Sequence, residues 1–180
     1  MQSIRVKDKE FVRSVSSRQI STAVRRIANA INQDFAGQSP LFVVILNGAF
    51  IFAADLLRRI TIPCEISFVK YRSYSGTGST GTIQELIGLR EDIRGRKVIV
   101  VDDIVDTGVT MDYILQHLKE IQPAEVKLAA LLFKPEAFTR SFQIDYLGLE
   151  IPNRFVVGYG LDYDGYGRNM KEIYSEIVKS

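Results

Sequence analysis

The feature that most constrains the fold is a run of four β-branched residues followed at once by acidic ones. Val98 to Val101 is entirely apolar, as expected of a strand buried on both faces of a parallel sheet. Asp102 and Asp103 stand where we expect this strand to end, and a short turn from Asp106 to Thr110 follows. Apolar residues then recur at helical spacing from Met111 to Ile121. The segment is therefore expected to form a strand, a turn rich in carboxylates and a helix.

Such a unit suits a ligand that carries both phosphate and hydroxyl groups. Ligands of open parallel sheets bind beyond the carboxyl ends of the strands. The N–H groups at the helix start, with the hydroxyls of Thr107 and Thr110 beside them, can hold an anion. The carboxylates can bind hydroxyls or a metal, and without such a partner they would repel one another. The pattern favours a phosphorylated sugar; an ordinary turn with solvated acids is the alternative.

The rest of the chain predicts further alternation of strands and helices. Ser16 to Gln19 matches a capping box ahead of a helix that ends before Gly37. A second helix is expected at 50–60, and strands at 41–46, 64–71, 126–133, 144–149 and 155–158. Residues 1–15 show no clear periodicity, 83–89 fit either a strand or a helix, and 72–82, rich in Gly, Ser and Thr, should be a mobile loop. This order predicts an α/β fold with a mainly parallel sheet in one domain.

Length, composition and charge exclude several classes of protein. The 180 residues, 46% hydrophobic and 24% charged, fit one globular domain with a sizeable core. The net charge of +2 gives no argument for nucleic-acid binding. Cys64 is the single cysteine, which excludes an internal disulfide, and its apolar neighbours predict a buried thiol. No apolar run reaches the roughly 18 residues of a membrane span, and the N-terminus lacks a signal peptide's apolar region. We therefore expect a cytoplasmic protein without membrane partners.

Gly76 to Gly81 matches the G-x-G-x-x-G pattern of dinucleotide-binding proteins, and Asp102 follows about 20 residues later, as that pattern requires. The pattern needs a tight turn from a strand directly into a helix. Here four polar residues separate Tyr71 from Gly76, so the geometry is unsuitable. Thr82 stands where a P-loop would need lysine. NAD binding is therefore a disfavoured alternative.

The segment from Val98 to Thr110 resembles the motif that binds 5-phosphoribosyl-1-diphosphate (PRPP) in phosphoribosyltransferases. Both have an apolar strand, two acidic residues, two apolar residues and then Asp-Thr-Gly-x-Thr. The resemblance runs from about Leu41 to Arg168 and points to the hypoxanthine-guanine phosphoribosyltransferases. It implies a type I phosphoribosyltransferase fold with a small hood made of the N-terminal segment and the residues after about 134. It also implies Mg²⁺ as cofactor and a homodimer or homotetramer.

The resemblance assigns roles to particular residues. The catalytic candidates are Asp106, for proton transfer at the imidazole edge of the purine, and Lys134, as donor to its 6-oxo group. Asp102, Asp103 and Asp162 would hold metal. Phe155 would stack on the purine, Arg168 would bind diphosphate, and the Ser73–Tyr74 loop would close over the site. The substrate-binding candidates are Asn47, Gly48, Ser73, Tyr74, Asp102, Asp103, Ile104, Val105, Asp106, Thr107, Gly108, Val109, Thr110, Lys134, Phe155, Val156, Asp162 and Arg168.

Several of these residues also have a purely structural interpretation. Lys134 could be a solvated lysine at a strand end, and Phe155 could be a core residue. Asp162 and Arg168 could form an exposed charged turn. Asn47 departs from the family, which commonly has lysine there, so diphosphate binding at this turn would depend on backbone N–H groups. A cis peptide before Gly48 would fit the family.

The resemblance predicts purine salvage, in which hypoxanthine or guanine and PRPP give IMP or GMP and diphosphate. A transferase that prefers xanthine stays open, because the side chains around Lys134 and from Val156 to Asp162 would decide the base. A nucleotide-sensing regulator with the same fold that binds nucleic acid is the alternative from another class. It should carry a basic face or an added domain, and the net charge of +2 argues against it.

Overall fold

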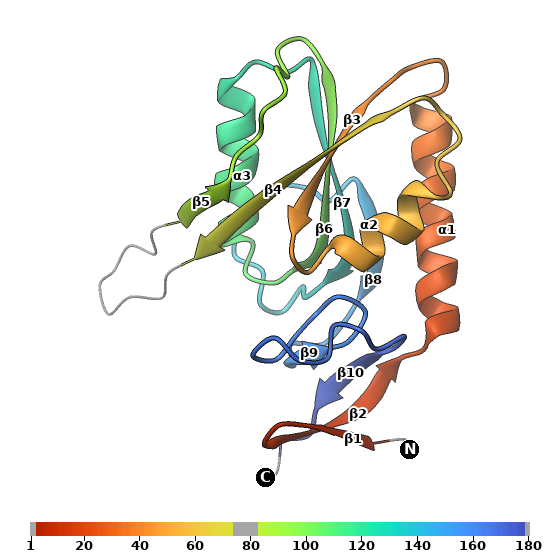
Figure 1. The fold of residues 1–180 in the computed structure, drawn as a ribbon, viewed down its shortest axis with the longest axis vertical. Helices are drawn as coiled ribbons and strands as arrows, with labels where there is room; N and C mark the ends of the chain where they lie inside the picture. Colours follow the sequence, from red (N-terminus) through yellow and green to blue (C-terminus); the bar gives the residue numbers. More distant parts are fainter. Residues whose placement is uncertain (1–2, 74–82, 179–180) are drawn as a thin grey trace.

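The computed structural model describes residues 3–73 and 83–178, and its fold consists of two sheets and three helices within these ranges (Figure 1). The larger sheet has six strands in the order β5-β4-β3-β6-β7-β8, and the smaller has four in the order β1-β2-β10-β9. In chain order the elements are β1 (Ser3–Val6), β2 (Lys9–Val15), α1 (Ser17–Asp34), β3 (Leu41–Leu46), α2 (Phe50–Leu57), β4 (Glu65–Ser73), β5 (Ile83–Ile87), β6 (Lys97–Val105), α3 (Val109–Glu120), β7 (Glu125–Phe133), β8 (Tyr146–Glu150), β9 (Val156–Val157) and β10 (Ile173–Glu176).

The larger sheet confirms the predicted α/β class. All its neighbouring strands are parallel except β4 and β5. From β3 the chain passes through α2 to β4 on one side, and from β6 it passes through α3 to β7 on the other. The connections therefore leave β3 and β6 in opposite directions. The crevice beyond the carboxyl ends of two such strands is the usual ligand site of this fold class.

Helices cover both faces of the larger sheet (Figure 1). The apolar faces of α1 and α2 pack against one side of the central strands, including Phe42 and Val44, and α3 packs against the other, including Val43 and Val100. Because both faces are covered, Val98 to Val101 are fully buried, as their unbroken apolar run predicts. The described residues contain no helix that is long and apolar enough to cross a membrane.

The start of α1 follows from its first residues. The N–H of Gln19 donates to the hydroxyl of Ser16 at 3.4 Å, and the N–H of Ser16 donates to the side-chain oxygen of Gln19 at 3.0 Å. This reciprocal capping box satisfies two N–H groups that would otherwise lack partners at the helix start. The prediction of a capped helix here is confirmed.

The smaller sheet lies at the end of the molecule toward which β3 and β4 point (Figure 1). It joins the hairpin β1–β2 to β10 and β9, all by antiparallel pairing. Of the residues after 134, β8 instead extends the larger sheet beside β7. The hood therefore begins after β8, later than expected. That the whole chain forms one domain stays a prediction.

Other differences have local causes. No strand was predicted in residues 1–15, because β1 and β2 fully bury only Val6, Phe11 and Val15, which hides the alternation of a strand. The short strand β10 was likewise not predicted, and α2 ends at 57 instead of 60. Strand β4 continues to residue 73, into the expected loop, of which 74–82 lie outside the described residues. Cys64 is half-buried, and burial raises the pKa of its thiol.

Three tyrosines of the fold should titrate late. Tyr71 donates to Glu85 at 3.0 Å, Tyr146 to Asp34 at 2.7 Å, and Tyr159 to Asp55 at 2.6 Å. Burial, followed by the hydrogen bond to the carboxylate, raises the pKa of each phenol well above its usual value of 10.0. A raised pKa in the folded state gives stability that is present below about pH 10 and is lost as the pH rises further.

We therefore expect the protein to unfold at alkaline pH, and we expect these three tyrosines to ionise only as it unfolds. A titration that records tyrosinate absorbance and circular dichroism together checks this. Ionisation of all the tyrosines while the circular dichroism stays native would contradict the prediction.

Candidate active site

The candidate site lies where β3 and β6 separate. The two strands pair only as far as Val44 and Val101, although β3 continues to Leu46 and β6 to Val105. The acidic pair was expected to follow the strand, but it lies within β6, because β7 still pairs with β6 at Asp102 and Ile104. The carboxylates are therefore placed by a regular strand with an open side, which holds them more firmly than a loop would.

A cavity of about 250 Å³, here called the main cavity, opens at this point. Its lining comes from the turn after β3, the end of β6, the residue after β7, and the segment around and after β9. The lining residues are Gly48, Asp103, Ile104, Asp106, Lys134, Phe155, Val156, Leu161, Asp162 and Arg168. Nine of these ten were candidates from the sequence, and Leu161 was missed although it lies between predicted residues.

Two glycines allow the segments of the main cavity to approach one another. A Cβ atom on Gly48 would lie 1.8 Å from the Oδ2 atom of Asp103. A Cβ atom on Gly160, whose φ is +103°, would lie 2.1 Å from the carbonyl oxygen of Gly48. A side chain at Gly160 would push the loop away from the Gly48 backbone, whereas one at Gly48 would require the Asp103 carboxylate to shift. The acidic strand, the turn after β3 and the loop after β9 are thus stacked through glycine contacts.

A second, smaller cavity of about 110 Å³ lies beside it and is here called the turn cavity. Asp102 and the predicted anion-binding turn line it, with Met111 as a member that the sequence did not single out; the complete lining is Asp102, Ile104, Val105, Asp106, Thr107, Gly108, Val109, Thr110 and Met111. Gly108 has a φ of +81° and precedes α3 directly. The first N–H groups of a helix have no acceptor within it, so this turn offers donors to an anion.

Asp102 and Asp103 therefore divide between the two cavities while staying in contact. The N–H of Asp103 donates to Oδ1 of Asp102 at 3.1 Å. Burial raises the pKa of both carboxyls, and the charge of Asp103 raises that of Asp102 further. Burial is opposed at Asp103, because hydrogen bonds with Asp102 and the backbone, together with the charge of Arg168, lower the pKa of its carboxyl. Two half-buried like charges in contact favour a bound proton, or else a ligand that supplies a cation or hydroxyl donors.

The remaining charges of the main cavity form two pairs. The ammonium of Lys134 lies 2.5 Å from Oδ2 of Asp106, and the side chain of Lys134 is 7% exposed whereas that of Asp106 is 45% exposed. Arg168 lies 2.7 Å from Oδ1 of Asp162 and donates to the carbonyl of Gly160, also at 2.7 Å. The burial of Lys134 excludes a solvated strand-end lysine, and these pairs hold both cations at the cavity wall.

Phe155 presents its ring at the mouth of the main cavity. It is 40% exposed, so it is not a core residue, and its ring centroid lies 6.2 Å from that of Phe11 and 5.7 Å from that of Tyr163. The ammonium of Lys9 lies 5.3 Å from the same centroid. The N-terminal strand β2 thus supports this ring although it lines neither cavity.

The other predicted site residues lie apart from both cavities or cannot be placed. Asn47 is exposed, and the peptide bond that precedes it, between Leu46 and Asn47, is cis, one residue earlier than expected. Ser73 ends β4. Tyr74 and the G-x-G-x-x-G segment at 76–81 lie outside the described residues.

Comparison with known proteins agrees with this geometry. The phosphoribosyl transferase domain model matches residues 15–164. A hypoxanthine-guanine phosphoribosyltransferase of Streptococcus pneumoniae is 40% identical over 169 residues, which cover 89% of this chain and 94% of that protein. The crystal structure of a hypoxanthine-guanine phosphoribosyltransferase from Bacillus anthracis superposes with a TM-score of 0.87 at 35% identity, covering 96% of this chain and 100% of that one. A hypoxanthine phosphoribosyl transferase of Trypanosoma cruzi gives 0.88 at 31% identity, with coverage of 97% and 95%.

The glycine stacking predicts a difference between two substitutions in one loop. Gly160→Ala would place a methyl group against the Gly48 carbonyl, whereas Gly165→Ala, also at positive φ, would meet no atom within 4 Å. Both should suffer the backbone cost of about 1–2 kcal/mol. Only Gly160→Ala should add an overpacking cost of about 1–3 kcal/mol. Urea unfolding measures the free energy of unfolding of both variants. An equal decrease in the two would show that the close approach of Gly160 to Gly48 does not contribute to stability.

Proposed function

The chain belongs to the phosphoribosyl transferase domain family, in its hypoxanthine-guanine branch, and from this premise we propose how its residues share the reaction. It is a transferase of purine salvage that converts hypoxanthine or guanine and PRPP into a 5′-mononucleotide and diphosphate. One observation carries the assignment of residues. The main cavity brings an acidic strand, a buried lysine, an open aromatic ring and an arginine together from separate segments.

We assign the 5′-phosphate of PRPP to the turn cavity. The N–H groups from Thr107 to Thr110 and the two threonine hydroxyls suit its oxygens. Asp102 and Asp103 stand between this cavity and the main one, where the ribose hydroxyls would lie. Hydroxyls donate to carboxylates, so ribose binding would compensate the burial that raises the pKa of both groups. The sugar would thus bridge the two cavities.

The same carboxylates fit Mg²⁺ as cofactor. Among the described residues no cluster of three or more His, Cys, Asp or Glu could hold a metal without further ligands. Mg²⁺ commonly takes one or two carboxylates and completes its shell with water and substrate phosphates, so two half-buried aspartates suffice. Asp102 and Asp103 would hold one ion, and Asp162, at the diphosphate side, would hold another. When bound, the metal would offset the charge that grows on the leaving diphosphate.

The purine would lie between Phe155 and the pair of Lys134 and Asp106. An ammonium group has three donors, so Lys134 can keep its bond to Asp106 and also donate to the 6-oxo oxygen. Asp106, half-exposed at both cavities, can accept the proton that the imidazole edge of the base must lose. Phe155 offers an open face for stacking. Arg168 would bind the diphosphate beside the Gly48 turn.

Assembly and location remain proposals. A homodimer or homotetramer is supported by Phe50, Ile66 and Phe68, which stay more than 40% exposed. Ile66 and Phe68 lie in register with Phe42 and Val44 of β3, on the sheet face that α1 and α2 cover only in part. Sedimentation velocity would show a monomer if this apolar face has no partner. A cytoplasmic location likewise stays a prediction, which cell fractionation would test.

Product formation from PRPP and Mg²⁺ with hypoxanthine, guanine, xanthine and adenine tests the proposed function directly. Hypoxanthine and guanine should react, and removal of Mg²⁺ should abolish the reaction. Lys134→Ala should reduce the preference for hypoxanthine over adenine, because the 6-amino group of adenine no longer faces a cation. Lys134→Arg is the matched control, since it keeps the charge. Unchanged selectivity in Lys134→Ala would exclude the lysine from base recognition.

Asp106→Ala separates proton transfer from binding. A positioned acid or base is typically worth about 10² to 10⁴ in rate, so kcat should fall by that factor while PRPP affinity changes little. Asp106→Asn keeps the shape and hydrogen-bonding capacity but cannot take the proton, so it should lose kcat to a similar extent. Steady-state kinetics and calorimetric titration of PRPP measure both quantities. Equal losses in kcat and affinity would reduce Asp106 to a binding residue.

A further inference from the structure

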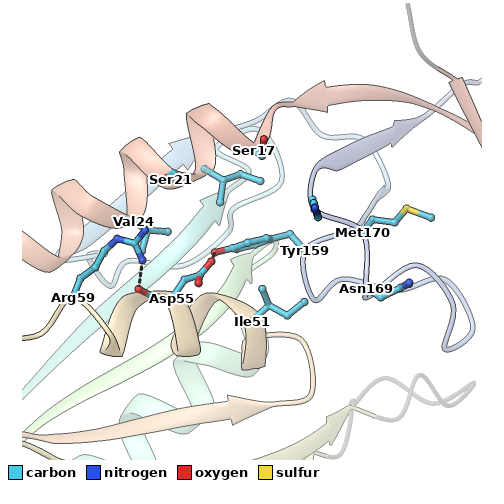
Figure 2. Close-up of a pocket in the computed structure, with 11 residues that line it drawn as sticks. Ser17, Ser21, Val24, Ile51, Asp55, Arg59, Tyr159, Asn169 and Met170 are labelled. Carbon is cyan, nitrogen blue, oxygen red and sulfur yellow. Dashed lines mark hydrogen bonds between the residues drawn. The ribbon is translucent and has the colours of Figure 1, made fainter.

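A third cavity, of about 300 Å³, lies between α1, α2 and the segment after β9, away from the proposed substrates. Figure 2 shows the ring of Tyr159 reaching across it toward Asp55 on α2, with Arg59 just beyond the C-terminal end of that helix. The Tyr159 hydroxyl donates to Oδ2 of Asp55 at 2.6 Å. Tyr159 is only 6% exposed and Asp55 is half-buried, so this charge-assisted bond is partly buried.

Tyr159 stands at the base of the loop that supplies Asp162 and Arg168. Its N–H donates to the carbonyl of Met170 at 2.9 Å, and the N–H of Gly160 donates to the carbonyl of Arg168 at 2.9 Å. The guanidinium of Arg168 returns to the carbonyl of Gly160 at 2.7 Å. The loop is thus closed on itself by backbone bonds. An anchor at Tyr159 therefore fixes the position of the whole loop.

The partner of Tyr159 belongs to the other wall of the main cavity. Helix α2 begins at Phe50, directly after the turn that contains Gly48. The Tyr159–Asp55 bond therefore ties the loop to the same short unit that Gly160 touches at the Gly48 carbonyl. The side chain and the backbone contact restrain the loop at two points. Loss of either would let Arg168 move relative to the Gly48 turn.

Phe155 and Val156 do not depend on this anchor. Val156 pairs with Ser175, and Val157 pairs with Tyr174, in the smaller sheet. The ring of Phe155 rests on Phe11. The part of the main cavity that would hold the purine is therefore braced by the smaller sheet.

We propose that Asp55 and Tyr159 form a positioning pair that fixes the Asp162–Arg168 loop against the Gly48 turn and so sets affinity for the diphosphate end of PRPP, leaving purine affinity unaffected. The inference rests on the proposed function, because it takes that function's placement of diphosphate and purine. It adds two residues that touch neither substrate.

Tyr159→Phe removes the hydroxyl and keeps the ring that fills the cavity wall. We expect the KM for PRPP to rise about tenfold while the KM for hypoxanthine stays within about twofold. Asp55→Ala should have the same effect, and combining the two should add little, since both break one bond. Asp55→Asn keeps an oxygen acceptor and should restore most of the affinity for PRPP.

Tyr146→Phe is the matched control. Tyr146 is 5% exposed and donates to a carboxylate, Asp34, at 2.7 Å, but it lies on β8 and lines none of the three cavities. The Tyr146→Phe variant should show a decrease in the free energy of unfolding in urea similar to that of Tyr159→Phe, without any change in either KM. If Tyr159→Phe behaves like Tyr146→Phe in both KM values, the bond is merely structural and the proposal is overturned.

Hydrogen exchange gives a readout that does not need activity. Tyr159→Phe should speed the exchange of the amides at 158–168, and Tyr146→Phe should not. Unchanged exchange in that loop would overturn the positioning pair even if the enzyme is active. A wild-type protein that makes no nucleotide from PRPP would instead overturn the proposed function, and the exchange experiment would still decide whether the anchor exists.

Discussion

The placing of two neighbouring, half-buried carboxylates on β6 is the constraint on which the rest of the site depends. A chain has little reason to place Asp102 and Asp103 inside a sheet, where burial raises the pKa of both. The surrounding residues partly compensate this unfavourable pair of carboxylates. Gly48 leaves room for the Asp103 carboxylate, and Arg168 lends it a compensating charge. Protein groups alone satisfy such a pair poorly, and a bound sugar with the proposed metal would relieve it, so the same feature that weakens the fold would strengthen substrate binding.

The second sheet converts this acidic edge into an enclosed site. The larger sheet, with the residue directly after β7, supplies the carboxylates and Lys134, which we propose as the groups for sugar, metal and the 6-oxo oxygen. The aromatic face and the arginine come from residues after β8, and β2 supports that aromatic face from behind. Contact between the two parts is made through a shared hydrophobic cluster that includes Val156 and Leu161, through Gly160, and through the hydrogen bond from Tyr159 to Asp55 on α2. The relative positions of the site residues thus depend on how the hood packs against the larger sheet, as well as on the residues of the crevice.

Sequence reasoning succeeded where local pattern and global fold agree. The apolar run of β6 and the periodic helix after it, like the capping box of α1, appear where they were predicted, because each is decided by neighbouring residues. It failed for β1 and β2, which expose much of their surface and therefore show no clean alternation. It also failed for β10, whose four residues are mostly buried and too few to show a period. Sequence reasoning also ended β6 too early. A carboxylate near the end of a strand is locally unfavourable, and only the pairing of β6 with β7 keeps the acidic residues in the strand.

The sequence by itself determined the α/β class and the strand–turn–helix unit, and its family resemblance pointed to nine of the ten residues that line the main cavity. Only the tertiary structure decided how they meet. It assigned Asp102 and Asp103 to different cavities, buried Lys134 beside Asp106, and stacked Gly160 on Gly48. The reason is physical: hydrophobic periodicity and capping act between residues close in the chain, whereas burial, charge pairing and close backbone approach join residues that only the completed fold brings together.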